Sequence, residues 1–148
     1  MPTVVSSIDI ATSPDTVWAL ECDPHRFPEF ADPTERMTDV PDTEFGVGYT
    51  YSEYGGIKPF LSESEWTVTA FEPKTRMIHE GDDGTMRFHL TIDITPVDGG
   101  THLVKTLVMK PRWYMAPISA LLWPVMMRKR AQETLDKTVA NVKRITES

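Results

Sequence analysis

The sequence has little cysteine and little positive charge. Cys22 is the only cysteine among 148 residues, so no disulfide can form within the chain, and nothing indicates secretion. Lys and Arg number 15 against 22 Asp and Glu, which gives a formal net charge of −7. Because nucleic-acid-binding surfaces need clustered cations, this balance argues against a nucleic-acid partner.

The first residues do not resemble a secretory signal peptide. The first residues, Met-Pro-Thr-Val-Val, contain neither the basic segment nor the apolar core of a signal peptide. We therefore expect a cytoplasmic protein. The composition, 40% hydrophobic and 25% charged, is that of a globular protein, and its length predicts one domain over residues 1–148.

The longest apolar run covers residues 115–127 and is too short to cross a membrane. A spanning helix needs roughly twenty residues, and Pro117 and Pro124 interrupt this run. Peripheral contact remains an alternative, since Arg128, Lys129 and Arg130 follow at once. An all-round apolar helix would touch a cavity on one side and a loop, a dimer partner or a lipid surface on the other. The plain alternative is packing against a sheet.

The remaining pattern predicts strand, two short helices, several strands and one long helix. In residues 3–10 every second position belongs to one apolar face, which is typical of a strand, and Ser13-Pro14 is a typical helix start. Residues 25–30 suggest a second helical turn. Residues 36–110 read as about six strands joined by short turns, hence an antiparallel meander. A long helix should begin between Pro111 and Pro117 and end near Thr146.

This order resembles the helix-grip fold of the START and polyketide cyclase–dehydratase (SRPBCC) superfamily. The resemblance covers about residues 3–146 and is carried by the segments SIDIATSPDTVWALECDPHRFPEF, GVGYTY, EWTVTAFEPKTRM and GGTHLVKTL. It implies an α+β fold, in which a seven-stranded curved antiparallel sheet, two short helices and a long C-terminal helix enclose a central cavity. Members of this superfamily bind lipids, isoprenoids or polyketides, and some cyclise or dehydrate them. Fold alone does not choose among these roles.

Strand parity predicts which side chains face the cavity. In residues 86–94 the even positions are apolar, so they should point inward. A two-residue turn at Asp83-Gly84 would place His79 opposite Phe88, and Glu80 opposite Arg87 as an outer charge pair.

A second turn gives the same buried set. A two-residue turn at Pro73-Lys74 would place Ala70 near Met77, Val68 near His79, and Trp66 near Gly81. A three-residue loop at either turn would reverse the parity.

The turn patterns leave two orientations open for each of two charged residues. The last hairpin allows either Leu103, Lys105 and Leu107 or Val104, Thr106 and Val108 to face inward. Since burying an unpaired lysine is costly, we expect the second set inside and Lys105 outside. Glu53 lies on a probable strand and could face either the cavity or water, and a solvated acid is the favoured interpretation.

His79 is the only histidine that this parity places in the interior. It is either a neutral core imidazole or a group that contacts a ligand or transfers protons. His79 and His89 fall on opposite faces, and no cluster of His, Asp and Glu has ligand spacing, so we expect no metal and no cofactor.

The sequence thus predicts a module that binds a small hydrophobic or amphipathic ligand, such as a lipid, an isoprenoid or a polyketide-like molecule. The alternative is a cyclase or dehydratase that acts on a carbonyl-containing hydrophobic substrate, with His79 as acid or base. Trp113 and Tyr114 either line a pocket mouth or attach the last helix to the sheet. The expected ligand-binding residues are Trp66, Val68, Met77, His79, Met86, Phe88, Leu90, Trp113, Leu122 and Met126.

Overall fold

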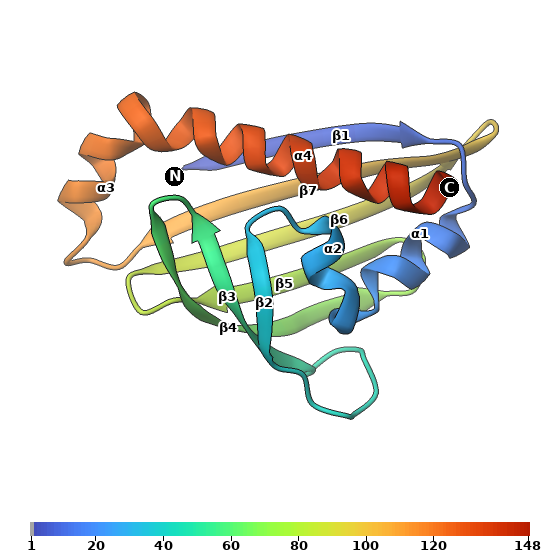
Figure 1. The fold of residues 1–148 in the computed structure, drawn as a ribbon, viewed down its shortest axis with the longest axis horizontal. Coiled ribbons are helices and arrows are strands. Elements are labelled where there is room, and N and C mark those ends of the chain that lie inside the picture. The colour runs from blue at the N-terminus through green and yellow to red at the C-terminus, as the bar shows by residue number, and fades with distance from the viewer. Residues whose placement is uncertain (1) are drawn as a thin grey trace.

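The computed structural model describes residues 2–148 and confirms a curved, seven-stranded antiparallel sheet (Figure 1). The strand order is β1-β7-β6-β5-β4-β3-β2, so each strand after β1 pairs with its neighbour in sequence, and β1 closes on β7. The strands are β1 (Thr3–Ile10), β2 (Thr34–Asp39), β3 (Thr50–Ile57), β4 (Phe60–Glu72), β5 (Arg76–Asp82), β6 (Met86–Val97) and β7 (Gly100–Pro111).

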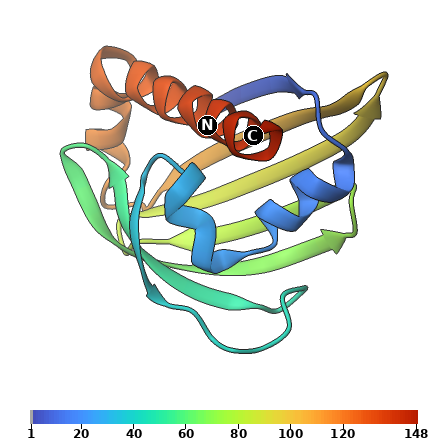
Figure 2. The same cartoon turned by 45° about the vertical axis from the view of Figure 1, so that its right-hand side comes forward.

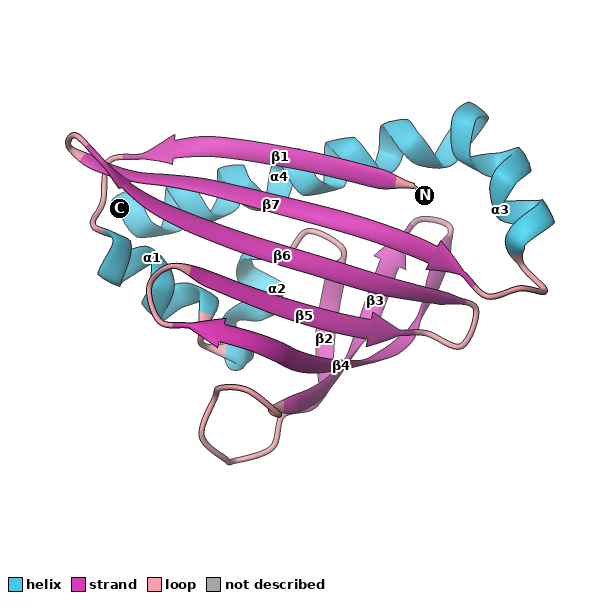
Figure 3. Ribbon diagram, turned by 180° about the vertical axis from the view of Figure 1, so that it is seen from behind, coloured by secondary structure: helices cyan, strands magenta, loops and turns pink. Residues whose placement is uncertain are grey.

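The helices all lie on the concave side of this sheet. Figure 3, seen from behind, shows the strands in front and the long helix behind them. In Figure 2 the two short N-terminal helices lie between that long helix and the lower strands. The helical elements are α1 (Pro14–Glu21), η1 (Pro24–Arg26), α2 (Phe27–Phe30), α3 (Ala116–Leu122), η2 (Trp123–Met127) and α4 (Arg128–Glu147).

The start of α1 follows the predicted capping pattern. The Ser13 Oγ accepts a hydrogen bond from the Thr16 backbone N–H at 3.3 Å, and Pro14 occupies the first helical turn. The helix buries Val17, Trp18 and Leu20 against the sheet. Capping and apolar spacing together therefore locate this helix correctly from sequence.

The long C-terminal helix has the predicted ends but is interrupted. It begins at Ala116, within the predicted window, and ends at Glu147. The π-helical segment η2 contains Pro124, which cannot donate the hydrogen bond that a regular helix requires. Figure 1 shows α3 turned away from the axis of α4 at this point.

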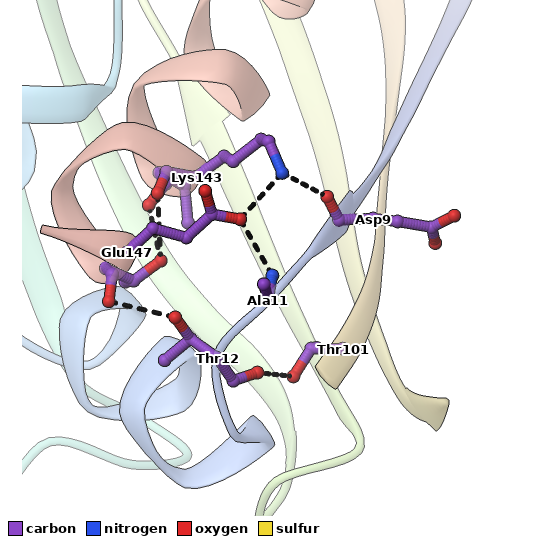
Figure 4. A network of polar contacts seen from close by, with 8 residues as sticks. Asp9, Ala11, Thr12, Thr101, Lys143 and Glu147 are labelled. Carbon is purple, nitrogen blue, oxygen red and sulfur yellow. Dashed lines mark hydrogen bonds and ion pairs between the residues drawn. The ribbon is translucent and has the colours of Figure 1, made fainter. Parts of the chain in front are cut away.

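A polar network holds the far end of α4 to β1 (Figure 4). The Glu147 Oε2 accepts hydrogen bonds from the Ala11 N–H at 2.7 Å and from the Lys143 Nζ at 2.6 Å. Lys143 Nζ also donates to the Asp9 carbonyl at 2.9 Å, and Thr12 Oγ1 donates to the Thr146 carbonyl at 2.9 Å. These bonds fix the C-terminal end of the helix over the sheet edge.

The hairpin between β5 and β6 corrects the predicted register by two residues. His79 lies opposite Leu90 rather than Phe88, and Glu80 lies opposite His89 rather than Arg87. The reason is Asp83, whose Oδ1 accepts bonds from the Thr85 and Met86 backbone N–H groups at 2.8 Å. Asp83 therefore stands at the first position of the turn, not in its centre. A shift of two leaves the predicted facing intact.

The hairpin between β4 and β5 contains the three-residue loop that would reverse the parity. Its central residue, Lys74, has a φ of 62°. A bulge at Thr69 compensates, because the register shifts between Val68 and Ala70. Ala70 consequently pairs with Ile78, so the predicted Ala70–Met77 contact is wrong. The predicted pairs Val68–His79 and Trp66–Gly81 are confirmed.

Candidate ligand-binding site

A cavity of about 260 Å³ lies between the concave face of the sheet and the C-terminal helices. Its walls are mainly apolar. The sheet contributes Trp66, Phe88, Leu90, Ile92, Leu107 and Met109, and the helices contribute Phe27, Phe30, Leu122, Met127, Ala131 and Leu135. A hydrophobic molecule that leaves water for this space would gain roughly 25 cal/mol for each Å² of apolar surface buried.

Stacked aromatic rings form one wall. The Trp66 ring lies parallel to Tyr51 at 6.3 Å and to Phe88 at 5.6 Å between centroids. Gly81 allows this arrangement, because a Cβ there would lie 2.5 Å from the Trp66 ring. The Trp66 Nε1 donates to the Ser64 hydroxyl at 2.8 Å, which satisfies its only polar atom.

The inner end of the cavity holds a buried ion pair, and this corrects the predicted facing of β7. Lys105 points inward and is 2% exposed, beside Glu21 of α1, which is 1% exposed. The Lys105 Nζ lies 3.0 Å from Glu21 Oε1, with hydrogen-bond geometry, and 2.8 Å from Oε2. The argument against burying Lys105 assumed that it had no partner. Glu21 supplies one, which offsets the cost of taking an ammonium group out of water.

Tyr51 and His79 form a second buried polar pair at this end. The Tyr51 hydroxyl lies 2.9 Å from His79 Nδ1, and His79 Nε2 lies 2.9 Å from the Met77 sulfur. Burial lowers the pKa of His79 to about 3, and the positive charge of Lys105 contributes to this shift in the same direction. The imidazole is therefore neutral at pH 7, and both of its nitrogens have partners within the protein.

Glu53 also lies on the cavity wall, which corrects the expectation of a solvated acid. It belongs to β3, two residues beyond Tyr51 on the same strand face. Its Oε2 accepts a hydrogen bond from Thr34 Oγ1 at 2.8 Å. Burial raises the pKa of the Glu53 carboxyl to about 7, and the Thr34 bond reduces the shift. The carboxyl is thus poised to exchange a proton near neutral pH.

The structure brings six of the ten predicted ligand-binding residues to the cavity wall: Trp66, His79, Met86, Phe88, Leu90 and Leu122. Val68 and Met77 are fully buried in the core and Met126 is partly buried, but none of these three lines the cavity. Trp113 is 85% exposed and also lies away from it. Sequence reasoning missed Glu21, Tyr51, Glu53 and Lys105, whose only signal was a charged or hydroxyl group on an otherwise apolar face.

The cavity reaches the surface at the end near α3. Three of its lining residues, Phe60, Thr85 and Ile118, are exposed, and we call this region the mouth. Figure 1 shows α3 at the opposite end of the sheet from α1. The ion pair at Glu21 therefore lies far from the mouth, at the closed end.

Several other kinds of site are not supported in the part of the chain that the structure describes. Within residues 2–148 no three His, Cys, Asp or Glu side chains come together as metal ligands. None of the described helices is long and apolar enough to cross a membrane. Burial raises the pKa of the Cys22 thiol to about 12, so this cysteine is a poor nucleophile at neutral pH.

Known structures with the same fold cover almost the whole chain. A protein from Thermus thermophilus aligns over 98% of this chain and 97% of its own, with 19% identity and a TM-score of 0.77. A protein from Chromobacterium violaceum aligns over 100% and 99%, with 13% identity and a TM-score of 0.75. A START superfamily protein from Mycobacterium smegmatis aligns over 98% and 97%, with 14% identity and a TM-score of 0.74.

Sequence comparison identifies the family directly. No curated protein matches the chain. A family model, described as polyketide cyclase / dehydrase and lipid transport, matches residues 1–147. With this match and the helix-grip fold shared with START proteins, the chain belongs to the polyketide cyclase / dehydrase and lipid transport family.

Proposed function

We propose that this protein binds one small hydrophobic or amphipathic molecule inside the cavity. The observation that carries the proposal is an apolar space of about 260 Å³ with a closed polar end and an open mouth. Known ligand pockets are likewise mainly apolar clefts with a few placed polar groups. A void of this size costs packing energy, so its presence in the fold favours a role in binding.

Two measurements test this function. Native mass spectrometry of freshly purified protein should show a bound small molecule of defined mass. Titration with the neutral fluorescent hydrophobe N-phenyl-1-naphthylamine should show saturable binding at one site per chain. Purely linear, non-saturating uptake of the dye by a protein free of any bound molecule would overturn the proposal.

Glu53 supports a second candidate function, acid–base catalysis on a carbonyl compound. A carboxyl whose pKa lies near 7 can both take and give a proton at neutral pH. His79, the acid or base proposed from the sequence, is the other candidate for this role. Both of its ring nitrogens, however, contact side chains of the protein, Tyr51 and Met77. An enzyme should accelerate deuterium exchange at the α-carbon of 2-decanone in D₂O, and Glu53→Gln should slow it about a hundredfold. Exchange at the solvent rate would exclude this candidate.

The surroundings of the mouth support peripheral membrane contact by a cytoplasmic protein. Trp113, Leu121 and Val125 are 85%, 71% and 77% exposed, in or beside α3 and η2. The basic residues 128–130 follow directly and are also exposed. An apolar face with aromatic residues beside cations fits an anionic lipid surface, in an otherwise acidic protein.

Vesicle sedimentation tests this contact. The protein should bind vesicles that contain phosphatidylglycerol more than pure phosphatidylcholine vesicles, and high salt should weaken that binding. The double substitution Leu121→Gln with Val125→Gln should abolish it. A concentration-dependent dimer that the same substitutions disrupt, without vesicle binding, would assign this face to a second copy instead.

A further inference from the structure

The charges on the cavity wall are unbalanced. Among the described residues the wall contains three carboxyl groups, those of Glu21, Glu53 and Asp83, but a single ammonium group, that of Lys105. This ammonium is already paired with Glu21. An acidic ligand, such as a fatty acid, would bring another negative charge into a space of low polarity that offers no free cation, which is strongly unfavourable.

The inner ion pair retains hydrogen-bonding capacity. The Lys105 ammonium has three N–H donors and makes one hydrogen bond, to Glu21 Oε1, within the part of the chain that the structure describes. Glu21 Oε2 is buried and accepts no hydrogen bond from the described residues, although Nζ lies 2.8 Å away. The pair thus offers both a donor and an acceptor.

We propose that the ligand is a neutral hydrophobic alcohol or phenol, whose hydroxyl lies at the Glu21–Lys105 pair while its apolar body extends toward the mouth. A hydroxyl is the simplest neutral group that both donates and accepts. It accepts from the Lys105 ammonium and donates to the Glu21 carboxylate. A ketone or ether satisfies only the ammonium, and a hydrocarbon satisfies neither group. This inference rests on the proposed binding function and specifies its ligand class.

The neighbouring side chains support this orientation. Tyr51 and His79 complete the closed end and are hydrogen-bonded to each other. The pair adds no net charge, because the imidazole of His79 is neutral. The Lys105 Nζ lies 5.0 Å above the centre of the Phe30 ring. From there to the mouth the walls are mainly aromatic and aliphatic, with the Trp66 and Phe88 rings along one side.

A matched series of ten-carbon ligands tests the inference. 1-Decanol, decyl methyl ether, decanoate and decylamine compete with N-phenyl-1-naphthylamine for the wild-type protein at pH 8. We expect 1-decanol to bind about tenfold or more tightly than the ether, because a hydrogen bond to a charged group has about that effect. Decanoate should bind more weakly than the ether. Equal or tighter binding of decanoate or decylamine than of 1-decanol would overturn the inference.

A variant locates the hydroxyl. The double substitution Glu21→Leu with Lys105→Met replaces the ion pair by apolar groups of similar volume and leaves no unpaired charge. It should still bind the dye but lose the preference for 1-decanol over the ether. The control Lys110→Met, an exposed lysine of the same strand, should keep that preference. If the dye binds and no alcohol preference exists, only this inference fails; if the dye does not bind, the proposed function fails.

Discussion

The two ends of the C-terminal helical segment differ in what holds them. At the far end, α4 buries Leu135, Val139 and Val142, and its last turn is hydrogen-bonded to the chain after β1. At the near end, α3 has no buried residue, although it is apolar on nearly all sides. The first end is a typical amphipathic helix, and the second covers a cavity. The C-terminal helical segment is therefore packed into the core along α4, whereas α3 lies over the mouth without a buried side chain.

The largest effect is expected at the closed end of the cavity, where the ion pair joins α1 to β7. Lys105→Met alone leaves the Glu21 carboxylate buried without a counter-charge, so we expect a loss of about 3 to 5 kcal/mol in unfolding free energy. The double substitution Glu21→Leu with Lys105→Met should lose far less. Urea denaturation measures both. Equal losses in the two variants would contradict the pairing.

A pair of leucine truncations compares the two ends directly. Leu135→Ala in α4 should cost about 2 to 5 kcal/mol, because it opens a hole beneath a buried side chain. Leu121→Ala in α3 should change stability by less than about 0.5 kcal/mol, since that side chain is 71% exposed. Thermal or urea unfolding separates them. A similar loss at both sites would mean that α3 is packed as firmly as α4.

Glu53, on the wall between the ends, should make stability depend on pH. Its pKa is about 7 in the folded protein against an ordinary value of 4.5, so the unfolded chain ionises first as pH rises. Wild-type stability should fall between about pH 4.5 and 7, by up to about 3 kcal/mol. Glu53→Gln should flatten this dependence, with no gain at pH 4 and the full gain above pH 8. Parallel curves for the two proteins would show that the carboxyl is solvated.

The smallest effect concerns the Tyr51–His79 pair. Tyr51→Phe removes the hydroxyl that lies 2.9 Å from His79 Nδ1, and we expect a loss of about 1 to 2 kcal/mol. Tyr54→Phe, at a half-buried position on the opposite face of the same strand, serves as the control and should be neutral. Histidine NMR should also report a changed Nδ1 environment. An unchanged His79 signal would contradict the hydrogen bond.

The fold was predictable from sequence because it depends on local patterns. The cap at Ser13, the alternation in β6 and the apolar spacing of α4 are each patterns among residues that are near one another in the sequence. The polar part of the site was not predictable in this way. Lys105 was expected outside because its partner, Glu21, is 84 residues away and lies on another element. The predicted Val68–His79 pair survived a longer loop only because a bulge at Thr69 compensates, and no turn pattern in the sequence indicates that bulge.

The most direct test of the central claim fills the cavity from its floor. Leu90→Trp places a larger side chain in the space, whereas Thr91→Trp places the same group on the opposite face of the same strand. We predict that Leu90→Trp abolishes saturable binding of N-phenyl-1-naphthylamine while Thr91→Trp binds it as the wild type does, with both variants folded by circular dichroism. Undiminished one-site binding by Leu90→Trp would show that the ligand does not lie in this cavity.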